Sequence, residues 1–279
     1  MNVFLHMISY AIAKRSDSIM AEMNKMSTEI WYFSGTGQGK SLGKELGKRI
    51  MGAKLYNITP YSTRCNMNKL VENKNLILIY PVYASTVPLI LQEFLNQLQA
   101  KNSNVILMIL WGNAHNAHAC SCAKSILSNR GFHIVGAIEL VAQHSCLLKK
   151  ELNTFTNERI NKIIDYVNTS FEYPKEVEIK ESKDSAITRL LCSIPNSGAI
   201  KCVTKLEFDY EKCKHCNACV NICPTLARVT PNQVDEKHCI RCFACETICN
   251  QNAIHIHVAK IAKYALNHHQ KHLHKDRYL

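Results

Sequence analysis

Residues 213–224 read CKHCNACVNICP, and residues 239–249 read CIRCFACETIC. In both stretches two residues separate each of the first three cysteines, and three residues precede the fourth. The second stretch repeats the first after 26 residues, so that Ala218 recurs as Ala244. The eight cysteines of the repeat are Cys213, Cys216, Cys219, Cys223, Cys239, Cys242, Cys245 and Cys249. A segment this short cannot bury enough apolar surface to fold unaided. The repeat therefore predicts that cross-links through its cysteines stabilise the fold.

Cysteines can form three kinds of stabilising cross-link: disulfides, zinc sites and iron–sulfur clusters. Disulfide frameworks are typical of short secreted domains, whereas this chain has 279 residues and 14 cysteines. Zinc sites use paired C-x2-C arms with four ligands in all, and two complete runs of four fit that pattern poorly. Three cysteines at this spacing can hold one face of a cubane iron–sulfur cluster. The spacing therefore favours iron–sulfur clusters.

The run that ends in Cys223-Pro224 resembles the signature of bacterial two-cluster ferredoxins, and the resemblance extends over residues 206–257. In that family the fourth cysteine of each run ligates the other cluster. One [4Fe-4S] cluster is thus expected on Cys213, Cys216, Cys219 and Cys249, and the other on Cys239, Cys242, Cys245 and Cys223. The second run ends Cys249-Asn250 where the family usually has Cys-Pro, so that turn lacks the fixed φ of proline.

Upstream of the repeat, short apolar runs alternate with helical patterns. The apolar runs are Ile30–Phe33, Leu55–Ile58, Leu76–Tyr80, Val105–Leu110 and Ile134–Val141. Helical spacing of apolar residues occurs in residues 42–50, 90–98, 114–127 and 160–167. Nearly continuous apolar runs are typical of parallel strands buried on both faces. The alternation predicts an α/β fold with a doubly wound, parallel five-stranded sheet.

A glycine-rich loop follows the first predicted strand. Residues 33–41 read FSGTGQGKS, which combines small residues and hydroxyls at the start of a helix. Backbone N–H groups in such a loop can cradle a phosphate. An ATP or GTP loop fits Gly39-Lys40-Ser41, but Ser34 stands at the position of the first required glycine. No predicted strand ends in an aspartate that could hold magnesium.

The segment Ser34–Gln38 resembles the phosphate loop of flavodoxins, [ST]-x-T-G-x-[ST], with Gly39 at the last hydroxyl position. The resemblance implies FMN at the carboxyl ends of the strands, beside the topological switch point. Loops after the third and fourth strands would complete the site, and Tyr83 or Trp111 could pack on the isoalloxazine ring or simply belong to the core. The expected FMN-binding residues are Ser34, Gly35, Thr36, Gly37, Gln38, Gly39, Lys40, Tyr83, Ala84, Ser85, Thr86, Trp111, Gly112 and Asn113.

The layout as a whole resembles the EFR-type family, which fuses a flavodoxin-like domain to a small α+β ferredoxin domain with two [4Fe-4S] clusters. We expect a flavodoxin-like domain at 29–170, a linker at 171–204 with a short helix near 186–192, a ferredoxin domain at 205–258, and a basic, His-rich tail at 259–279. Residues 1–28 are expected to be an extension that is untranslated or disordered, with translation starting at Met26.

The net charge of +12 is uneven, because residues 29–170 hold 15 Lys and Arg against 8 Asp and Glu. A basic body suits anionic partners, and we expect redox partner proteins rather than nucleic acid because no nucleic-acid motif accompanies the charge. No apolar stretch approaches the ~18 residues of a membrane span, so no integral span is expected. The absence of an export signal favours a cytoplasmic location. The oligomeric state is not predicted.

These patterns predict an electron-transfer protein that moves single electrons between two [4Fe-4S] clusters and FMN. One alternative is a flavin-dependent oxidoreductase that acts on a small molecule, although no catalytic acid–base residues stand out in the sequence. The other alternative is a nucleotide-binding switch that carries clusters.

Overall fold

The computed structural model describes residues 26–112, 118–147, 155–179, 198–270 and 275–279. Three of the sequence-based expectations lie outside these residues. They are the extension up to residue 25, Asn113 in the expected flavin site, and the short helix near 186–192.

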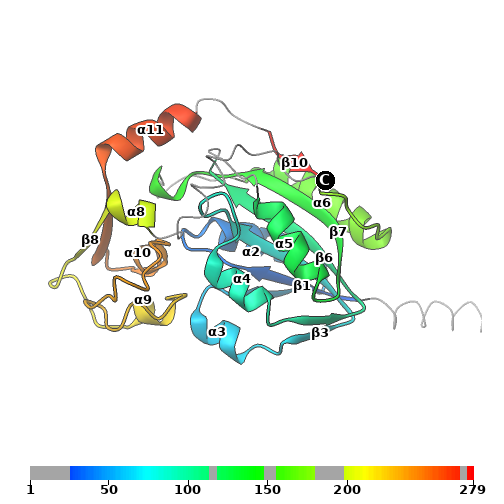
Figure 1. Cartoon of the computed structure of the whole chain (residues 1–279), viewed down its shortest axis with the longest axis horizontal. Helices are drawn as coiled ribbons and strands as arrows, with labels where there is room; N and C mark the ends of the chain where they lie inside the picture. The colour runs from blue at the N-terminus through cyan, green and yellow to red at the C-terminus, as the bar shows by residue number, and fades with distance from the viewer. Residues whose placement is uncertain (1–25, 113–117, 148–154, 180–197, 271–274) are drawn as a thin grey trace, which may run out of the picture.

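A six-stranded sheet forms the centre of the protein (Figure 1). In spatial order the strands are β2 (Lys54–Asn57), β1 (Ser27–Tyr32), β4 (Lys74–Pro81), β6 (Ser103–Trp111), β7 (Phe132–Val141) and β10 (Arg277–Tyr278). The first five are parallel, and β10 is antiparallel to β7. Because β1 lies between β2 and β4, the strand order reverses there, which makes the sheet doubly wound. The prediction of a mixed α/β fold with a mostly parallel sheet is confirmed.

Helices cover both faces of the sheet (Figure 1). One face packs against α4 (Leu89–Leu95) and α5 (Ala119–Ser128), and the other packs against α2 (Gln38–Arg49) and α6 (Asn157–Glu172). Successive residues of a strand enter opposite cores, as Ile77 and Leu78 do in β4. The continuous apolar runs follow from burial on both faces. Strand β2 departs from this pattern because it is an edge strand, and its Leu55 is exposed.

Several elements were not expected from the sequence. Helix α3 (Tyr61–Asn66) follows β2, and β3 (Leu70–Glu72) pairs in parallel with β5 (Gln99–Lys101) as a small second sheet. The residues of the expected tail also fold, because α11 (Lys260–Gln270) is followed by β10. The sheet therefore has six strands where five were expected. Strand β10 covers the edge of β7, whose backbone groups would otherwise lack partners.

The cysteine repeat folds into a small unit of its own. Its elements are α8 (Gly198–Cys202), β8 (Thr204–Phe208), α9 (Ala218–Asn221), α10 (Ala244–Ile248) and β9 (Ile254–Val258), and β8 and β9 form an antiparallel ribbon. The 26-residue repeat is also a repeat of backbone conformation. Three pairs of left-handed residues stand 26 positions apart: His215 and Arg241, Asn217 and Phe243, and Leu226 and Asn252. The two halves thus follow the same local path.

This cysteine unit is packed against the sheet domain rather than tethered to it. Cys146, from the 3-10 helix η1 (Ser145–Leu147) after β7, is buried in one apolar cluster with Phe243, Ile256 and Val258 of the unit. In Figure 1, α11 lies beside the unit, whereas β10 lies at the edge of the sheet. Within the described residues, no helix is both long enough and apolar enough to cross a membrane.

Polar contacts fasten the carboxyl-terminal strand. The guanidinium of Arg159 in α6 donates to both carboxylate oxygens of Asp276, each at 2.6 Å. The same carboxylate accepts from the backbone N–H of Val141, and the ring of Tyr278 lies 5.3 Å from that of Tyr166. Both members of the ion pair are less than a fifth exposed. The ion pair is therefore well placed to hold the end of the chain on the sheet.

The replacement Asp276→Ala should lower the stability of the protein, because it leaves the half-buried Arg159 without its carboxylate. Hydrogen bonds to charged groups contribute about 1.5–3 kcal/mol each, and a loss of ~2 kcal/mol would lower Tm by about 4–8 °C. Thermal unfolding followed by circular dichroism measures this change. Lys162→Ala removes the exposed pair with Glu158 and should leave Tm within about 1 °C. Equal effects of the two variants would contradict this role of Asp276.

Candidate functional site

The glycine-rich loop connects β1 to α2 at the carboxyl edge of the sheet. The side-chain oxygen of Thr59 accepts a hydrogen bond from the backbone N–H of Ser34 at 2.8 Å. Gly37 has a φ of 88°, a left-handed conformation that glycine adopts readily, and α2 starts directly after it. No side chain caps this helix, and its first turn holds no acidic residue. The uncapped N–H groups form an end with positive potential.

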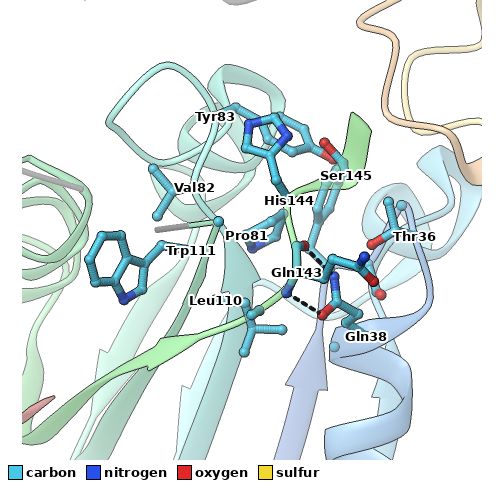
Figure 2. Close-up of a pocket in the computed structure, with 16 residues that line it drawn as sticks. Thr36, Gln38, Pro81, Val82, Tyr83, Leu110, Trp111, Gln143, His144 and Ser145 are labelled. Atoms are coloured by element: carbon cyan, nitrogen blue, oxygen red, sulfur yellow. Dashed lines mark hydrogen bonds between the residues drawn. The ribbon is translucent and has the colours of Figure 1, made fainter. Parts of the chain in front are cut away.

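A small cavity adjoins the loop (Figure 2). It has a volume of about 40 Å³, and its walls come from the segments after β1, β4, β6 and β7. In Figure 2, Trp111 points away from Thr36 and Gln38. The ring of His144 packs directly against Gly112 in the cavity wall. A Cβ on Gly112 would lie 2.7 Å from that ring, so the contact leaves no space for a side chain. This cavity is far smaller than the roughly 300–1,000 Å³ of typical ligand pockets.

A much larger cleft lies beside the small cavity and shares Thr36, Gln38 and Ser145 with it. Its volume is about 730 Å³, and it runs between the loop and the cysteine unit. Its wall on the sheet domain consists of Thr36, Gly37, Gln38, Ser41, Ser145, Cys146 and Phe155. Its wall on the cysteine unit and α11 includes Phe243, Glu246, Thr247, Cys249 and Lys263. The cleft therefore joins the loop to a cysteine of the repeat.

The structure brings together many of the residues expected in a flavin site. Those that line the small cavity are Ser34, Gly35, Thr36, Gln38, Gly39, Tyr83, Trp111 and Gly112, and Gly37 lines the cleft. Lys40, Ala84, Ser85 and Thr86 line neither space, and Lys40 is exposed. The aromatic residues of the cleft are Phe155 and Phe243, whereas Tyr83 and Trp111 are among the residues that line the small cavity.

Gln38 and Ser34 play different parts in the loop. The Gln38 amide donates to the carbonyl of Gln143 at 2.8 Å and accepts from the Gln143 N–H at 3.1 Å, which holds the loop after β7 in place (Figure 2). The hydroxyl of Ser34 is buried, with no hydrogen-bond partner in the described part of the chain. An unpaired buried hydroxyl is costly and is readily satisfied by a ligand oxygen.

The loop after β4 contains a strained turn. Tyr83 and Thr86 exchange two backbone hydrogen bonds of 3.0 and 3.1 Å, and the residues between them, Ala84 and Ser85, have φ values of 47° and 64°. Residues other than Gly, Asn and Asp adopt this conformation at a cost of roughly 1 kcal/mol or more each. The turn holds Tyr83 against the cysteine unit, so the strain lies at the contact between the two parts of the protein.

The cysteines of the repeat surround two cavities. Cys223, Cys239, Cys242 and Cys245 line the first, which we call the Cys242 cavity. Cys213, Cys216, Cys219 and Cys249 line the second, which we call the Cys219 cavity. The cavities measure about 20 and 220 Å³ respectively. In each of them three cysteines come from one half of the repeat and the fourth comes from the other half. No group of three or more His, Cys, Asp or Glu residues in the described ranges could hold a single metal ion.

The pKa shifts of Cys242 and Cys219 agree with this division of the cysteines between two cavities. Burial raises the pKa of the Cys242 thiol, and the neighbouring Cys245, Cys223 and Cys239 raise it further. Burial also raises the pKa of Cys219, while the charge of Arg228 opposes that shift and Cys249 adds to it. Cys242 thus lies near the three other cysteines of its cavity, and Cys219 lies near Cys249 of its own. Metal ligation would require these thiols as thiolates, so iron would have to replace the protons that burial favours.

The Cys242 side of the unit meets the sheet domain in a close contact. A Cβ on Gly35 would lie 1.9 Å from the carbonyl oxygen of Cys242, so only glycine fits here. Burial holds the pKa of Tyr83 well above its ordinary value, and Cys242 and Cys146 add to this shift.

Arg64, which is 4% exposed, reaches the unit from α3. It donates to the carbonyls of Ile58 and Thr59 in its own domain and to that of Pro224 in the cysteine unit. One buried guanidinium therefore bridges the two parts.

Sequence reasoning did not identify His144, Phe155, Phe243 or Arg64 as parts of the site. The loop Ala142–Ser145 could have been found, because it follows the fifth parallel strand at the same edge as the other loops. No sequence pattern marks the other three residues. Their positions depend on how the cysteine unit docks.

Comparisons with known proteins add two findings. Residues 206–229, the first half of the cysteine repeat, match the family model described as a 4Fe-4S binding domain. Among solved structures, the chain is similar to a provisionally named flavoprotein from Bacteroides eggerthii DSM 20697, with 17% identity and a TM-score of 0.34. That similarity covers 51% of this chain and 98% of the other. No curated protein matches the chain.

The replacement Gly35→Ala should loosen the contact with the cysteine unit, because the added methyl group would overlap the Cys242 carbonyl. Amide hydrogen exchange should accelerate at least tenfold in residues 35–38 and 242–244. Gly47→Ala is the matched control, since the nearest heavy atom to a Cβ there is 3.9 Å away and alanine favours the helix. Unchanged exchange in Gly35→Ala would show that the contact does not hold the two parts together.

Proposed function

We propose that this protein transfers single electrons between two [4Fe-4S] clusters and an FMN bound beside the glycine-rich loop. One observation carries the proposal. The two cysteine cavities lie in a unit whose Cys242 carbonyl touches Gly35 of the loop, and Cys249 lines the same cleft as Thr36. Redox groups held at these positions would be neighbours within one chain.

The cysteines fit two clusters by their donor set. Four thiols around each cavity match the four ligands of a [4Fe-4S] cluster, and the match to a 4Fe-4S binding domain supports iron at this unit. The crossed grouping ties the halves of the repeat together, which explains how a unit with so small an apolar core can fold. Bound clusters supply one-electron transfer.

The cleft, and not the small cavity, has room for FMN. Its volume falls within the range of cofactor sites, whereas about 40 Å³ is too little for any ring system. At the loop, the uncapped start of α2 lines the cleft at Gly37 and Gln38, and the unpaired hydroxyl of Ser34 lies at the adjoining small cavity; a phosphate at the junction of the two spaces would meet hydrogen-bond donors where the helix dipole favours an anion. Bound FMN supplies one- and two-electron chemistry.

The topology supports the same location. The order β2-β1-β4-β6-β7 is the strand order of flavodoxin, whose FMN lies at the switch point. In this chain the switch point falls between β1 and β4, and the loops after these two strands carry Ser34 and Tyr83. Phe155 and Phe243 are the aromatic residues that can pack against a ring in the cleft.

A redox partner would meet the clusters at the Cys219 cavity. Cys216 is exposed there, whereas Cys242 is buried against the sheet domain. A partner protein is therefore proposed on the side of Cys216. No observation favours the nucleotide switch, because Lys40 lines neither the cavity nor the cleft.

The proposal is tested by assaying iron, acid-labile sulfide and released flavin on one anaerobically purified sample. About eight irons, eight sulfides and one FMN per chain are expected. Full clusters without flavin would remove the role of the loop from the proposal. Less than about four irons would refute the cluster sites.

Paired cysteine variants test the crossed grouping. The double variant Cys213→Ser/Cys249→Ser should keep about four irons, because both changes fall on the Cys219 cavity. The double variant Cys213→Ser/Cys223→Ser should lose both clusters, because its changes fall on different cavities. Uncrossed ligation would reverse the two results, with iron retained only when Cys213 and Cys223 are replaced together.

The replacement Ser34→Ala should weaken FMN binding about tenfold, because a hydrogen bond to a charged phosphate contributes about 1.5–3 kcal/mol. Fluorescence titration of flavin-free protein with FMN measures the affinity. Ser128→Ala is the control, since its hydroxyl is also buried and unpaired within the described residues but lies on α5 and lines neither the cleft nor the small cavity that Ser34 lines. Equal affinities of the two variants would place the phosphate elsewhere.

A further inference from the structure

The internal repeat makes the two cysteine cavities directly comparable, residue by residue. A shift of 26 positions pairs Arg241 with His215, and Arg228 with Ile254. Arg241 and Arg228 are 8% and 3% exposed, whereas His215 is exposed. At both matched positions a buried guanidinium therefore stands at the Cys242 cavity. Among the described residues that line the Cys219 cavity, the one Lys or Arg is Lys214, which is exposed and therefore screened by water, and its matched residue is Ile240.

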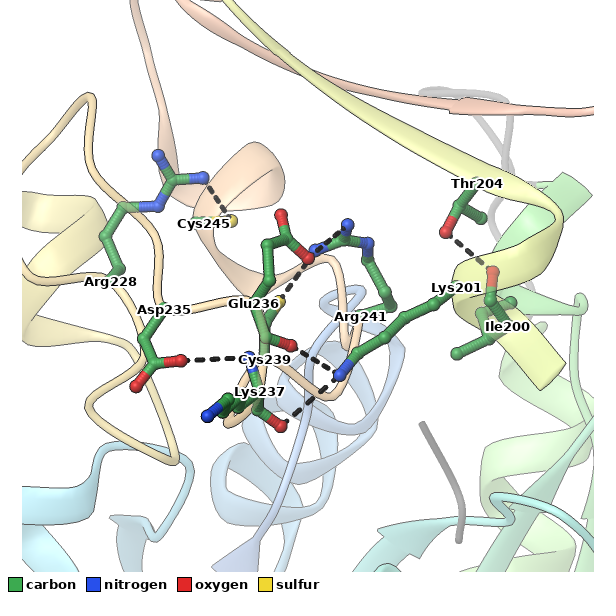
Figure 3. A network of polar contacts seen from close by, with 10 residues as sticks. All are labelled: Ile200, Lys201, Thr204, Arg228, Asp235, Glu236, Lys237, Cys239, Arg241 and Cys245. Carbon is green, nitrogen blue, oxygen red and sulfur yellow. Dashed lines mark hydrogen bonds and ion pairs between the residues drawn. The ribbon is translucent and has the colours of Figure 1, made fainter. Parts of the chain in front are cut away.

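The contacts of Arg241 are directed at the Cys242 cavity. Its Nη1 donates to Sγ of Cys239 at 3.1 Å, and its Nη2 donates to Oε2 of Glu236 at 2.7 Å. Figure 3 shows the guanidinium between these two groups. Its buried Nε has no hydrogen-bond partner among the described residues. Because Arg241 lines the cavity, a sulfur acceptor bound there would satisfy this nitrogen.

Two further arginines add positive charge on the same side. Nη2 of Arg228 donates to Sγ of Cys245 at 3.5 Å (Figure 3). Its Nη1 donates to the Pro231 carbonyl at 2.7 Å. Arg64 reaches the same region through the Pro224 carbonyl. The charge of Arg228 also acts on Cys219, which belongs to the other cavity. Of Arg241 and Arg228, Arg241 is therefore the one whose interactions with cysteines are confined to the Cys242 cavity.

The Cys219 cavity has weaker donors. Sγ of Cys213 accepts from the backbone N–H of His215 at 3.4 Å, and Sγ of Cys249 accepts from that of Ala253 at 3.3 Å. Both donors are neutral amides. Within the described ranges, no guanidinium donates to a sulfur of this cavity. Cys216, which is exposed, leaves this side accessible to a partner protein.

We infer that Arg241, assisted by Arg228, makes the cluster site of the Cys242 cavity the more easily reduced of the two. The inference rests on the proposed function, because it requires both cavities to hold clusters. Reduction adds one negative charge to a cluster, and no bond forms or breaks. A nearby positive charge and hydrogen bonds to the cysteine sulfurs stabilise that added charge, which raises the reduction potential. Of the two clusters, the one in the Cys242 cavity, beside Gly35 and the cleft, would therefore hold a shared electron for more of the time and could pass it to the flavin, while the exposed Cys219 cavity would exchange electrons with partners.

The repeat supplies its own exchange experiment. Arg241→His gives the Cys242 cavity the residue of its counterpart, and His215→Arg does the reverse. Anaerobic titration of the full chain with dithionite and redox mediators, followed by electron paramagnetic resonance, should show two one-electron steps in the wild-type protein. Arg241→His should lower the higher potential by an amount equal to about a tenfold loss of electron affinity, or ~59 mV for a one-electron couple. His215→Arg should raise the lower potential and leave the higher one unchanged.

A second variant keeps the test independent of folding defects. Glu236 is 57% exposed and partly offsets the charge of Arg241, so Glu236→Gln should raise the higher potential. Opposite shifts from Arg241→His and Glu236→Gln, with iron content near wild type, would establish an electrostatic role. If Arg241→His moved only the lower potential, or if Glu236→Gln shifted neither potential, the inference would be wrong. A wild-type iron content near four would instead refute the proposal that the protein holds two clusters. The failure of the proposed function can therefore be told apart from the failure of the inference about Arg241.

Discussion

The contact between the Cys242 carbonyl and Gly35 is the constraint on which the arrangement of this protein depends. It leaves no space for a side chain at residue 35, and it places one cysteine cavity directly against the glycine-rich loop. The strained turn at Ala84 and Ser85 holds Tyr83 beside the same contact. Backbone strain that collects at one place is often retained for function. Here it lies where the two redox sites would meet.

The buried guanidinium of Arg64 connects the sheet domain to the cysteine unit. Arg64 is buried where the cysteine unit docks, and backbone carbonyls from both parts accept its hydrogen bonds. Removing such partners would leave an uncompensated charge, which makes the docked geometry specific as well as stable. The carboxyl-terminal strand adds a second connection, because Asp276 ties the end of the chain to α6 and β7.

Much of this organisation could be predicted from sequence because it depends on local patterns. The spacing of the cysteines indicates iron–sulfur chemistry, and the buried runs around Leu76–Tyr80 and Val105–Leu110 indicate parallel strands. The docked contacts could not be predicted. Arg64 resembles any helical arginine until the cysteine unit covers it, and the pairing of β10 with β7 depends on tertiary contacts of Asp276 and Tyr278. The expectation that Tyr83 and Trp111 stack on a ring stays a prediction, and the cleft offers Phe155 and Phe243 instead.

The central claim is that electrons pass between clusters and flavin within one chain. The most direct test gives anaerobic, oxidised protein a rapid pulse of reductant that supplies less than one electron per chain, and then follows iron–sulfur and flavin absorbance at several protein concentrations. The account predicts that the clusters are reduced first and that the electron then reaches the flavin at a rate independent of protein concentration. A rate that rises in proportion to protein concentration would show transfer between molecules and would contradict the account.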